Sequence, residues 1–365
     1  MTQQQVRSSH PYFMYDAIQD QPLAVARMLE THSQQAEEVA SRLAEKRRLY
    51  LVGIGTSWHA ALIGEHWFRH FTAGAPEVQG WHSFEFVAYP PPLDENCAAI
   101  VISHRGTKTY SFQALELAKE RGALTVAITS TNPGPRIQAG DILFHTVEQE
   151  RSAAFTISYT SALAVLGMLA AQMGIQSGAS TAGELGQLER IPELMRDALH
   201  RERLVQGMAE RFHDRERFLF TGWGPNTANA YEAALKMKET SYTDNEGFQV
   251  EQILHGPFVA TSAGSLLTLI APPGPGYGRS LDIAHAAGEL GTPIWALVQD
   301  GDQDLSALAT EAFTLGVVPE LWSPLVYVVP LQLFTYFVAL ARECNPDIFH
   351  QNDPKYAAAR RHYTL

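Results

Sequence analysis

The sequence has little cysteine, and what it has forms no recognisable pattern. Only two cysteines occur in 365 residues, Cys97 and Cys344. Their separation fits neither a metal-binding pair nor a disulfide framework. We therefore expect no metal and no cofactor, and we expect a reducing, cytoplasmic location.

Positive charge is also in short supply. The chain has 27 Lys and Arg against 39 Asp and Glu, which gives a net charge of −12. Nucleic acid is therefore excluded as the main partner, because binding a phosphate backbone needs a basic face. A small phosphorylated molecule is not excluded, since it needs only a local group of donors.

Long apolar runs are missing as well. The N-terminal segment Met1–His10 is polar and has no apolar core of a signal peptide. The stretch closest to a membrane span is Leu325–Ala341, which Pro330, Gln332 and Thr335 interrupt. We expect a buried helix there and no membrane partner.

What the sequence does contain is an internal repeat. The segment Arg48–Gly55 reads as a buried strand that ends in a Gly-x-Gly turn, and a helical pattern follows over 58–70. Arg217–Gly224 has the same pattern, followed by a predicted helix over 227–240. The final glycines of the two turns are 169 residues apart. Self-similarity at a fixed offset indicates a duplicated fold.

Later elements repeat at almost the same offset. Predicted strands over Ala98–Ser103 and Leu124–Thr129 correspond to Leu266–Ala271 and Pro293–Val298. Short, continuous apolar strands separated by helices are typical of parallel sheets with both faces covered. The sequence therefore predicts an α/β fold with two tandem doubly wound parallel-sheet domains, each a three-layer α/β/α arrangement.

The expected domain boundaries follow from this repeat. We predict a helical lead-in over 1–35, a first domain over 36–178, a second domain over 190–340 and an irregular C-terminal tail over 341–365. The connection between the domains is expected in Gln176–Gly186, which is rich in Ser, Gly, Ala and Thr.

Two loops of the first domain have the composition of a phosphate site. They follow adjacent predicted strands, and they contain Gly55, Thr56 and Ser57, and then Ser103, Arg105, Gly106, Thr107 and Lys108. Backbone N–H groups at helix N-termini bind phosphate well, and the two cations add donors. The alternative is that Thr56, Ser57 and Ser103 are only helix caps. The matching loop of the second domain, Ala271–Gly278, has no early hydroxyl or basic residue.

A dinucleotide site is not supported by the glycines of the first loop. Gly53 and Gly55 begin a Gly-x-Gly-x-x-Gly pattern, but position 58 is Trp. The acidic residue expected about 20 positions later is absent as well.

Candidate acid and base residues lie in the second domain. Glu232, Lys236 and Glu239 fall on one face of the helix that follows Gly224. His255 precedes Gly-Pro and is able to carry protons near neutral pH. The alternatives are a solvated charged stripe and a structural histidine. A glutamate near a histidine suits proton transfer between adjacent sugar carbons.

Taken together, these residues resemble a known family. Both domains resemble sugar isomerase (SIS) domains, and the chain is similar to the isomerase half of the glucosamine-6-phosphate synthases. The resemblance rests on Ile18–Pro22, Gly55–His59, Glu232–Tyr242, His255–Pro257 and Pro330–Arg342, and it extends over nearly the whole chain.

The resemblance implies roles for individual residues. Glu239 would move the proton between C1 and C2, Lys236 would position the sugar oxygens, and His255 would open the ring. In the family this histidine comes from the neighbouring subunit, which implies a homodimer. Thr56, Ser57 and Ser103 would hold the phosphate, and Glu232 would line the sugar site.

The chain also departs from the family pattern. Arg105 and Lys108 replace two hydroxyl residues of the phosphate loop. The family's tail lysine, which forms a Schiff base, has only a displaced candidate here in Lys355. The glutaminase half of the synthases does not occur in the sequence, so we expect no ammonia production from glutamine.

The expected activity is therefore that of a sugar-phosphate isomerase or aminosugar-phosphate deaminase. It would catalyse an aldose–ketose or imine–enamine proton transfer on a phosphorylated sugar. A deglycase of fructosyl-amine phosphates and a non-catalytic sugar-phosphate sensor stay open as alternatives.

Overall fold

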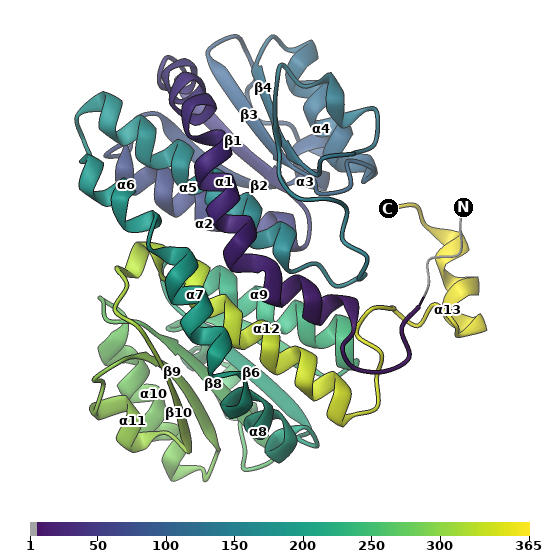
Figure 1. Cartoon of the computed structure of the whole chain (residues 1–365), viewed down its shortest axis with the longest axis vertical. Coiled ribbons are helices and arrows are strands. Elements are labelled where there is room, and N and C mark those ends of the chain that lie inside the picture. Colours follow the sequence, from purple (N-terminus) through teal and green to yellow (C-terminus); the bar gives the residue numbers. More distant parts are fainter. Residues whose placement is uncertain (1–5) are drawn as a thin grey trace. The chain divides into compact units, whose positions relative to one another are not determined.

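The computed structural model describes residues 6–365 and divides the chain into two compact units (Figure 1). The first unit comprises Asp20–Glu150, Phe155–Arg190 and His350–Leu365. The second comprises Ile191–Phe349 with Arg151–Ala154 and the residues up to Gln19. Each unit contains one parallel five-stranded sheet, which agrees with the α/β class expected from the sequence.

The sheet of the first unit has the strand order β2-β1-β3-β4-β5, with every pair parallel. Its strands are β1 (Arg48–Gly53), β2 (Glu77–His82), β3 (Cys97–Ile102), β4 (Leu124–Thr129) and β5 (Ile142–His145). The helices are α2 (Thr56–Phe71), α3 (Ser83–Ala88), α4 (Thr109–Glu120), α5 (Ile157–Ser177), α6 (Ala182–Leu188) and α13 (Pro354–Ala359). The long helix α1 (Phe13–Ala44) precedes them in the chain.

The second unit has a sheet of the equivalent order, β10-β9-β8-β6-β7, again all parallel. Its strands are β6 (Arg217–Gly222), β7 (Asn245–Gln249), β8 (Ser265–Ala271), β9 (Ile294–Gln299) and β10 (Glu311–Leu315). The helices are α7 (Ile191–His200), α8 (Glu202–Phe212), α9 (Asn226–Ser241), α10 (Tyr277–Glu289), α11 (Asp304–Leu308) and α12 (Ser323–Ala341).

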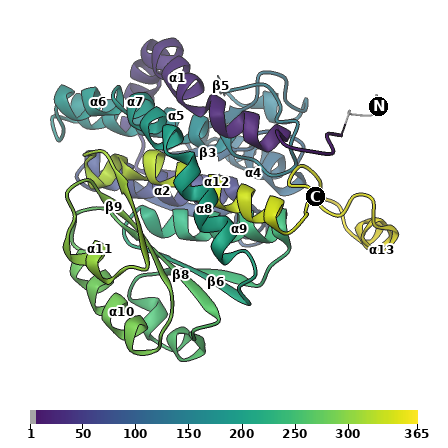
Figure 2. The ribbon, with the colours of Figure 1, turned by 60° about the horizontal axis from the view of Figure 1, so that its bottom comes forward.

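Helices cover both faces of this second sheet (Figure 2). On one face, Ile283 and Ala287 of α10 pack in one core cluster with Leu267 and Leu269 of β8. On the other face, the ring of Phe334 in α12 contacts those of Phe218 and Trp295. Burial on both faces is why these strands are continuously apolar in the sequence.

Glycines close the turn from strand to helix in the same way in both units. A Cβ on Gly53 would lie 2.3 Å from the carbonyl oxygen of Ser57, and a Cβ on Gly222 would lie 2.4 Å from that of Asn226. Only glycine permits this close approach. The turns bring the starts of α2 and α9 to the carboxyl ends of β1 and β6. These strands adjoin β3 and β8, where the winding of each sheet reverses and ligands bind in folds of this kind.

The segment Gln176–Gly186, where the connection between the domains is expected, includes the start of α6, because Thr181 and Glu184 form a capping box there. The predicted strands and helices agree with the structure to within a few residues, but one expectation is wrong in part. The tail 341–365 is not wholly irregular, because Asp353 caps α13 and Pro354 occupies its first turn. The domain boundaries stay a prediction.

Within residues 6–365, two helices are long and apolar enough to cross a membrane, judged by length and composition alone. They span Ile157–Ser177 and Glu320–Ala341, and 89% of the apolar window of each is buried inside the protein. We expected a buried helix and not a membrane span at Leu325–Ala341, and the observed burial agrees with that expectation.

Candidate functional site

The first candidate loop lies at the start of α2. Gly55 is the N-cap residue, with φ of 57°, and no side chain makes a capping hydrogen bond there. Thr56 and Ser57 are the first two residues of the helix, so the idea that they serve only as caps is wrong. Their side chains therefore lie at the positive end of the helix dipole.

The second candidate loop is folded tightly after β3. Ser103 is buried, its N–H donates to the carbonyl of Ile128 at 3.0 Å, and its carbonyl accepts from the Thr129 hydroxyl at 2.8 Å. Gly106 has a φ of +63°, and a Cβ there would lie 2.4 Å from the side chain of Ile137. The loop is therefore ordered by its own contacts.

The N-cap of helix α4 is not Ser103, the residue that the capping alternative named. The helix starts at Thr109, and its N-cap is Lys108, with no capping hydrogen bond from a side chain. Ser103 is thus not the cap of this helix. Lys108 is half-buried, whereas Thr107 is exposed on the outside of the loop.

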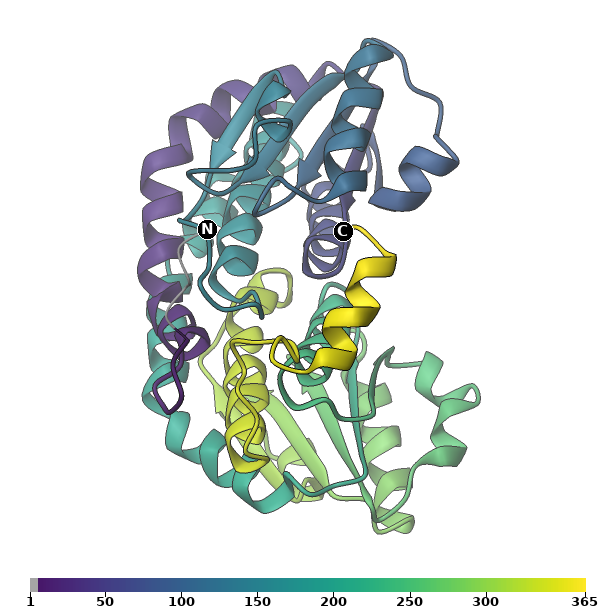
Figure 3. The same ribbon diagram turned by 90° about the vertical axis from the view of Figure 1, so that its right-hand side faces the viewer.

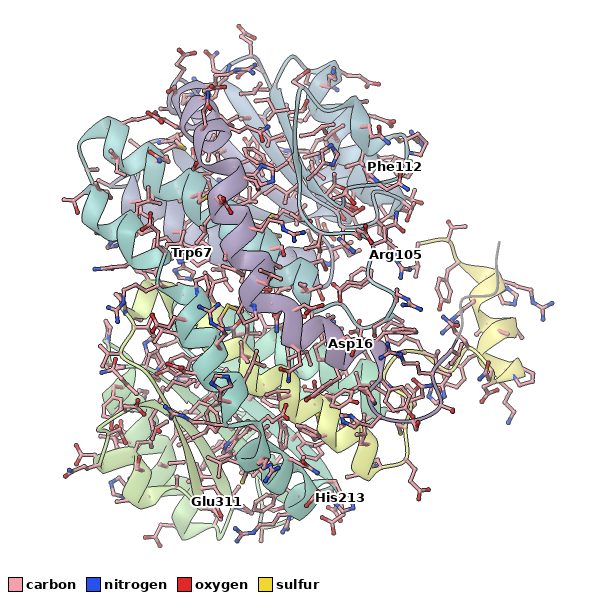
Figure 4. All side chains as sticks on the ribbon, in the orientation of Figure 1. Asp16, Trp67, Arg105, Phe112, His213 and Glu311 are labelled. Carbon is pink, nitrogen blue, oxygen red and sulfur yellow. The ribbon has the colours of Figure 1, made fainter. Side chains whose placement is uncertain are left out.

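Arg105 adds a positive charge to this loop (Figure 4). Its guanidinium donates to the carbonyl of Glu150 at 3.3 Å and lies 4.9 Å from the centre of the Phe155 ring. Among residues 6–365 it forms no salt bridge. Burial lowers the pKa of Arg105, because a charge removed from water is less stable. The arrangement suits the binding of an anion.

The adjacent residue, His104, was not among the sequence candidates. It is 7% exposed and its Nε2 accepts the N–H of Glu150 at 2.9 Å. Burial, with a smaller effect of Arg105, lowers the pKa of His104 to about 3, so the ring is neutral. The sequence offers one indication that His104 belongs to the site, because this residue directly follows Ser103 at the end of a buried strand.

A small cavity lies beneath the two loops. It has a volume of about 20 Å³ and is lined by Thr56, Ser57, Ala60, Ile102, His104, Ile128, Thr129, Thr146, Phe155, Ser158, Tyr159 and Ala162. The structure thus places Thr56 and Ser57 with His104 around one space. A volume of this size admits about one water-sized group.

Glu150 joins the second loop to α5, and sequence reasoning missed it as well. Its buried carboxylate accepts from the N–H groups of Thr156 and Ser158, at 2.9 and 3.0 Å, and from the Ser158 hydroxyl at 2.5 Å. A carboxylate at a helix N-terminus satisfies N–H groups that the helix leaves unpaired. Glu150 therefore fixes the segment that His104 and Arg105 contact.

In the second unit, α9 carries the predicted acid and base residues. The side chains of Glu232 and Lys236 are 0% and 1% exposed, and that of Glu239 is 21% exposed. Lys236 Nζ lies 3.4 Å from Glu232 Oε1 and pairs closely with Glu239 Oε2. The alternative of a solvated charged stripe is wrong, because the first two charges are buried.

His255 lies elsewhere on the second unit, with its side chain 67% exposed. Its Nε2 is 2.8 Å from Glu251 Oε1, and Arg279 makes two hydrogen bonds to the same carboxylate, at 2.5 and 2.9 Å. Arg279, and to a lesser extent His255, lowers the pKa of Glu251 to about 2. Within the described part of the chain, His255 pairs with Glu251 and makes no hydrogen bond to Glu239.

Lys355 is on α13, the short helix near the C-terminus (Figure 3). Its backbone N–H donates to Asp353 at 2.8 Å, and its side chain is exposed. Its amine forms no ion pair with any residue from 6 to 365. Lys355 belongs to the first unit, whereas Lys236, Glu239 and His255 belong to the second.

The second unit also has a hollow at the carboxyl ends of its strands, and this hollow is acidic. A cavity of about 420 Å³ is lined by residues after β8 and β9, including Tyr277, Asp300 and Asp302. Asp300 pairs with Arg201 at 3.4 Å, and Asp302 accepts from the hydroxyl of Tyr277. The cationic loop of the first unit has no counterpart here. Nowhere in residues 6–365 do three or more His, Cys, Asp or Glu form a group able to hold a metal ion.

Comparison with known families supports this description. The model of the SIS domain matches residues 42–172, which include both loops of the first unit. This part of the chain is a SIS domain. The recognition made from the sequence is thereby confirmed for that region.

Related proteins extend the similarity beyond the SIS domain. The chain is 30% identical over 346 residues to a glutamine–fructose-6-phosphate aminotransferase (isomerizing) of Thermococcus kodakarensis. The match covers 93% of this chain and 57% of the relative, so the chain spans little more than half the length of that protein.

Solved structures share the fold over both units. The C-terminal domain of glucosamine-fructose-6-phosphate aminotransferase from Francisella tularensis matches with a TM-score of 0.84 at 20% identity, covering 94% of this chain and 99% of that one. A glucosamine-6-phosphate deaminase from Thermotoga maritima matches with a TM-score of 0.74 at 21% identity, over 93% and 98%. At these identities the likeness establishes the fold alone.

Proposed function

We propose that the chain is an enzyme that transfers a proton between adjacent carbons of a phosphorylated sugar. Glu239 removes a proton from the carbon next to a carbonyl or imine group, and it returns the proton to the neighbouring carbon. Lys236 holds Glu239 in place and contacts the sugar oxygens. The SIS domain binds the phosphate group through Thr56, Ser57, Ser103 and Arg105.

The observation that carries this proposal is the charge cluster of α9. Burying the charges of Glu232 and Lys236 costs free energy that an apolar pair would not cost. Such an arrangement is typical of sites that use the charges for chemistry. Glu239 is the exposed member, so it is the one that a substrate can reach.

The substrate class is supported by the names of the similar proteins. They are an isomerizing aminotransferase of fructose 6-phosphate and a deaminase of glucosamine 6-phosphate. An isomerase, a deaminase and a deglycase all use the same proton shift on a phosphorylated sugar. We propose that this chain catalyses a reaction of that class, and that it works in the cytoplasm.

Glu239→Gln tests the proposal. Glutamine keeps the shape of the side chain but does not accept a proton, so kcat for a converted sugar phosphate should fall about 10²- to 10⁴-fold. Exchange of solvent deuterium into C1 or C2 should disappear with it. Lys238→Gln, on the exposed face of the same helix, is the matched control and should keep both the kcat and the deuterium exchange of the wild type.

Two results would contradict the proposal. Deuterium exchange that persists in the Glu239→Gln variant would remove Glu239 from the chemistry. Tight binding of sugar phosphates without any turnover would indicate a sensor in place of an enzyme.

We also propose that the chain acts as a homodimer in which His255 serves the site of the partner subunit. The support is the exposure of the His255 side chain and its pairing with Glu251, which lies outside α9. His255→Ala and Glu239→Gln variants, each inactive alone, should recover activity when their subunits are exchanged into mixed dimers. Mixed dimers that form and stay inactive would refute the shared site.

A further inference from the structure

A short 3₁₀ turn, η2 (Gln252–Leu254), fixes the backbone of His255, which is its C-cap residue. Ile253 of this turn is buried in the core cluster that also contains Ile283 of α10. Gly256 follows with a φ of +120°, a conformation that residues with a side chain rarely adopt. The turn therefore holds His255 against the core of the second unit.

The carboxylate of Glu251, at the start of the same turn, is held by Arg279 on both of its oxygens. Nε of Arg279 donates to Oε2 at 2.5 Å, and Nη2 donates to Oε1 at 2.9 Å. Nη1 donates to Asp282 at 2.9 Å, so the guanidinium is also held from its own helix α10. The side chains of Glu251 and Arg279 are 44% and 40% exposed, and exposed ion pairs contribute little to stability. What the pairing supplies is a fixed position for the carboxylate.

This carboxylate decides which nitrogen of His255 carries the proton. Arg279, and to a lesser extent His255, lowers the pKa of Glu251 to about 2, so the group is ionised near neutral pH and only accepts hydrogen bonds. Nε2 of His255, which lies 2.8 Å from Oε1 of Glu251, must therefore be the donor. In the neutral imidazole the other nitrogen, Nδ1, then has no proton.

Nδ1 is the nitrogen of His255 that is left for a substrate. Nε2 is occupied by Glu251, whereas Nδ1 makes no hydrogen bond with any residue from 6 to 365. The side chain is 67% exposed, so a molecule from outside this chain is able to reach it. This assignment follows from the pairing with Glu251 alone and does not depend on where the sugar binds.

Opening a sugar ring needs a group that accepts a proton and then returns it. The anomeric hydroxyl loses its proton, the bond between the anomeric carbon and the ring oxygen breaks, and the ring oxygen receives a proton. A neutral Nδ1 takes the first proton, and the imidazolium that forms returns it to the ring oxygen. The carboxylate of Glu251 stabilises this imidazolium, because opposite charges at a separation of 2.8 Å attract each other.

We infer that Glu251, fixed by Arg279, is a positioning residue that keeps Nε2 of His255 protonated and leaves Nδ1 to exchange protons with the sugar. This inference rests on the role of His255 in the proposed function. The effect of Glu251 on the imidazole, however, is measurable without any turnover.

NMR of the full chain measures this effect on the ring. Long-range ¹H–¹⁵N correlations distinguish the two neutral tautomers, and an ordinary histidine is neutral at about pH 8.5. The signals of His255 are those that His255→Ala lacks, and in the wild type they should show a protonated Nε2. Glu251→Gln should give a mixture of tautomers, because the amide offers one acceptor oxygen to the N–H groups of Arg279 and His255. Asp282→Asn removes the other carboxylate that Arg279 contacts, and as the matched control it should keep the wild-type spectrum.

Kinetics measure whether Glu251 acts through His255. In Glu251→Gln, kcat for a converted sugar phosphate should fall about tenfold or more with KM within a few-fold of the wild type, because proton transfer is impaired and binding is not. The double variant Glu251→Gln/His255→Ala should be no slower than His255→Ala alone, since a positioning residue has no effect without the residue that it positions. Asp282→Asn should keep the wild-type kcat.

Three outcomes would overturn the inference. The first is a wild-type spectrum with the proton on Nδ1. The second is a Glu251→Gln variant with the wild-type kcat while His255→Ala is impaired. The third is a double variant in which the two losses add, because Glu251 would then act independently of His255. If the spectra are as expected but no sugar phosphate is converted, the proposed enzyme fails while the positioning of His255 by Glu251 stands.

Discussion

Replacing Lys236 by methionine is a direct test of the charge cluster on α9. Methionine keeps most of the volume of the lysine stem, so packing changes little. The charge, however, is lost from a position where Lys236 and Glu232 are both almost completely buried. Glu232 would then be a buried carboxylate without its cation. Removing one partner of a buried ion pair costs about 3–5 kcal/mol of unfolding free energy.

The assay is thermal unfolding at pH 7, compared with a control on the same helix. A loss of this size should lower the melting temperature of the second unit by about 10 °C. Lys238→Met removes the same charge from the exposed face of α9 and should change stability by less than about 0.5 kcal/mol. The double variant Glu232→Gln/Lys236→Met should recover part of the loss, because the amide is neutral. If Lys236→Met melts no lower than Lys238→Met, the buried pair does not have the energetic role described here.

Three further predictions concern other parts of the molecule. Ser103→Ala should raise KM for a phosphorylated sugar about tenfold or more with little change in kcat, because it removes a donor to a charged group. An unchanged KM in a folded variant would place the phosphate elsewhere. Glu251 has a depressed pKa, so its interaction with Arg279 is complete above its ordinary value near 4.5 and is lost as the pH falls towards 2. Arg279→Gln should therefore raise the titration midpoint of Glu251, measured by NMR, and a midpoint that stays near 2 would contradict the assigned cause. If the Lys355 amine forms an imine with a ketose phosphate, borohydride should trap it as an adduct on the peptide that contains Lys355. Turnover without any adduct would leave Glu239 and His255 as the proton carriers.

Much of the fold was predictable because burial on both faces of a sheet leaves a clear trace in the sequence. β3 and β8 are continuous apolar runs, and the glycines after β1 and β6 recur at a fixed offset. The outer strands β2 and β7 were missed for the opposite reason. Their residues are only partly buried and include polar side chains, so no apolar run identifies them.

The candidate site was predictable only where a residue type reveals its chemistry. Glu239 and Lys236 stand out because they share one face of the helix that follows Gly224 and match the family pattern. His104 and Glu150 did not stand out, since their importance comes from a contact between segments 46 residues apart. Only the fold brings the N–H of Glu150 to the imidazole, so no local pattern predicts this hydrogen bond.

The two sheets have equivalent strand orders, yet the cationic loop after β3 of the first unit has no counterpart in the second. In the second unit Gly224 and Gly274 stand where the first has Gly55 and Gly106, at offsets of 169 and 168 residues. The Glu320 carboxylate lies against both: a Cβ on Gly224 or Gly274 would be 3.0 or 2.8 Å from its oxygens. The protein thus supplies its own anion at this place, and a second phosphate would be repelled by it. We therefore expect calorimetry to find a single phosphate bound per chain, weakened in Ser103→Ala and unaffected by substitutions that line the acidic hollow. Two phosphates per chain would show that Glu320 does not exclude the ligand, and the asymmetry between the units would then need another cause.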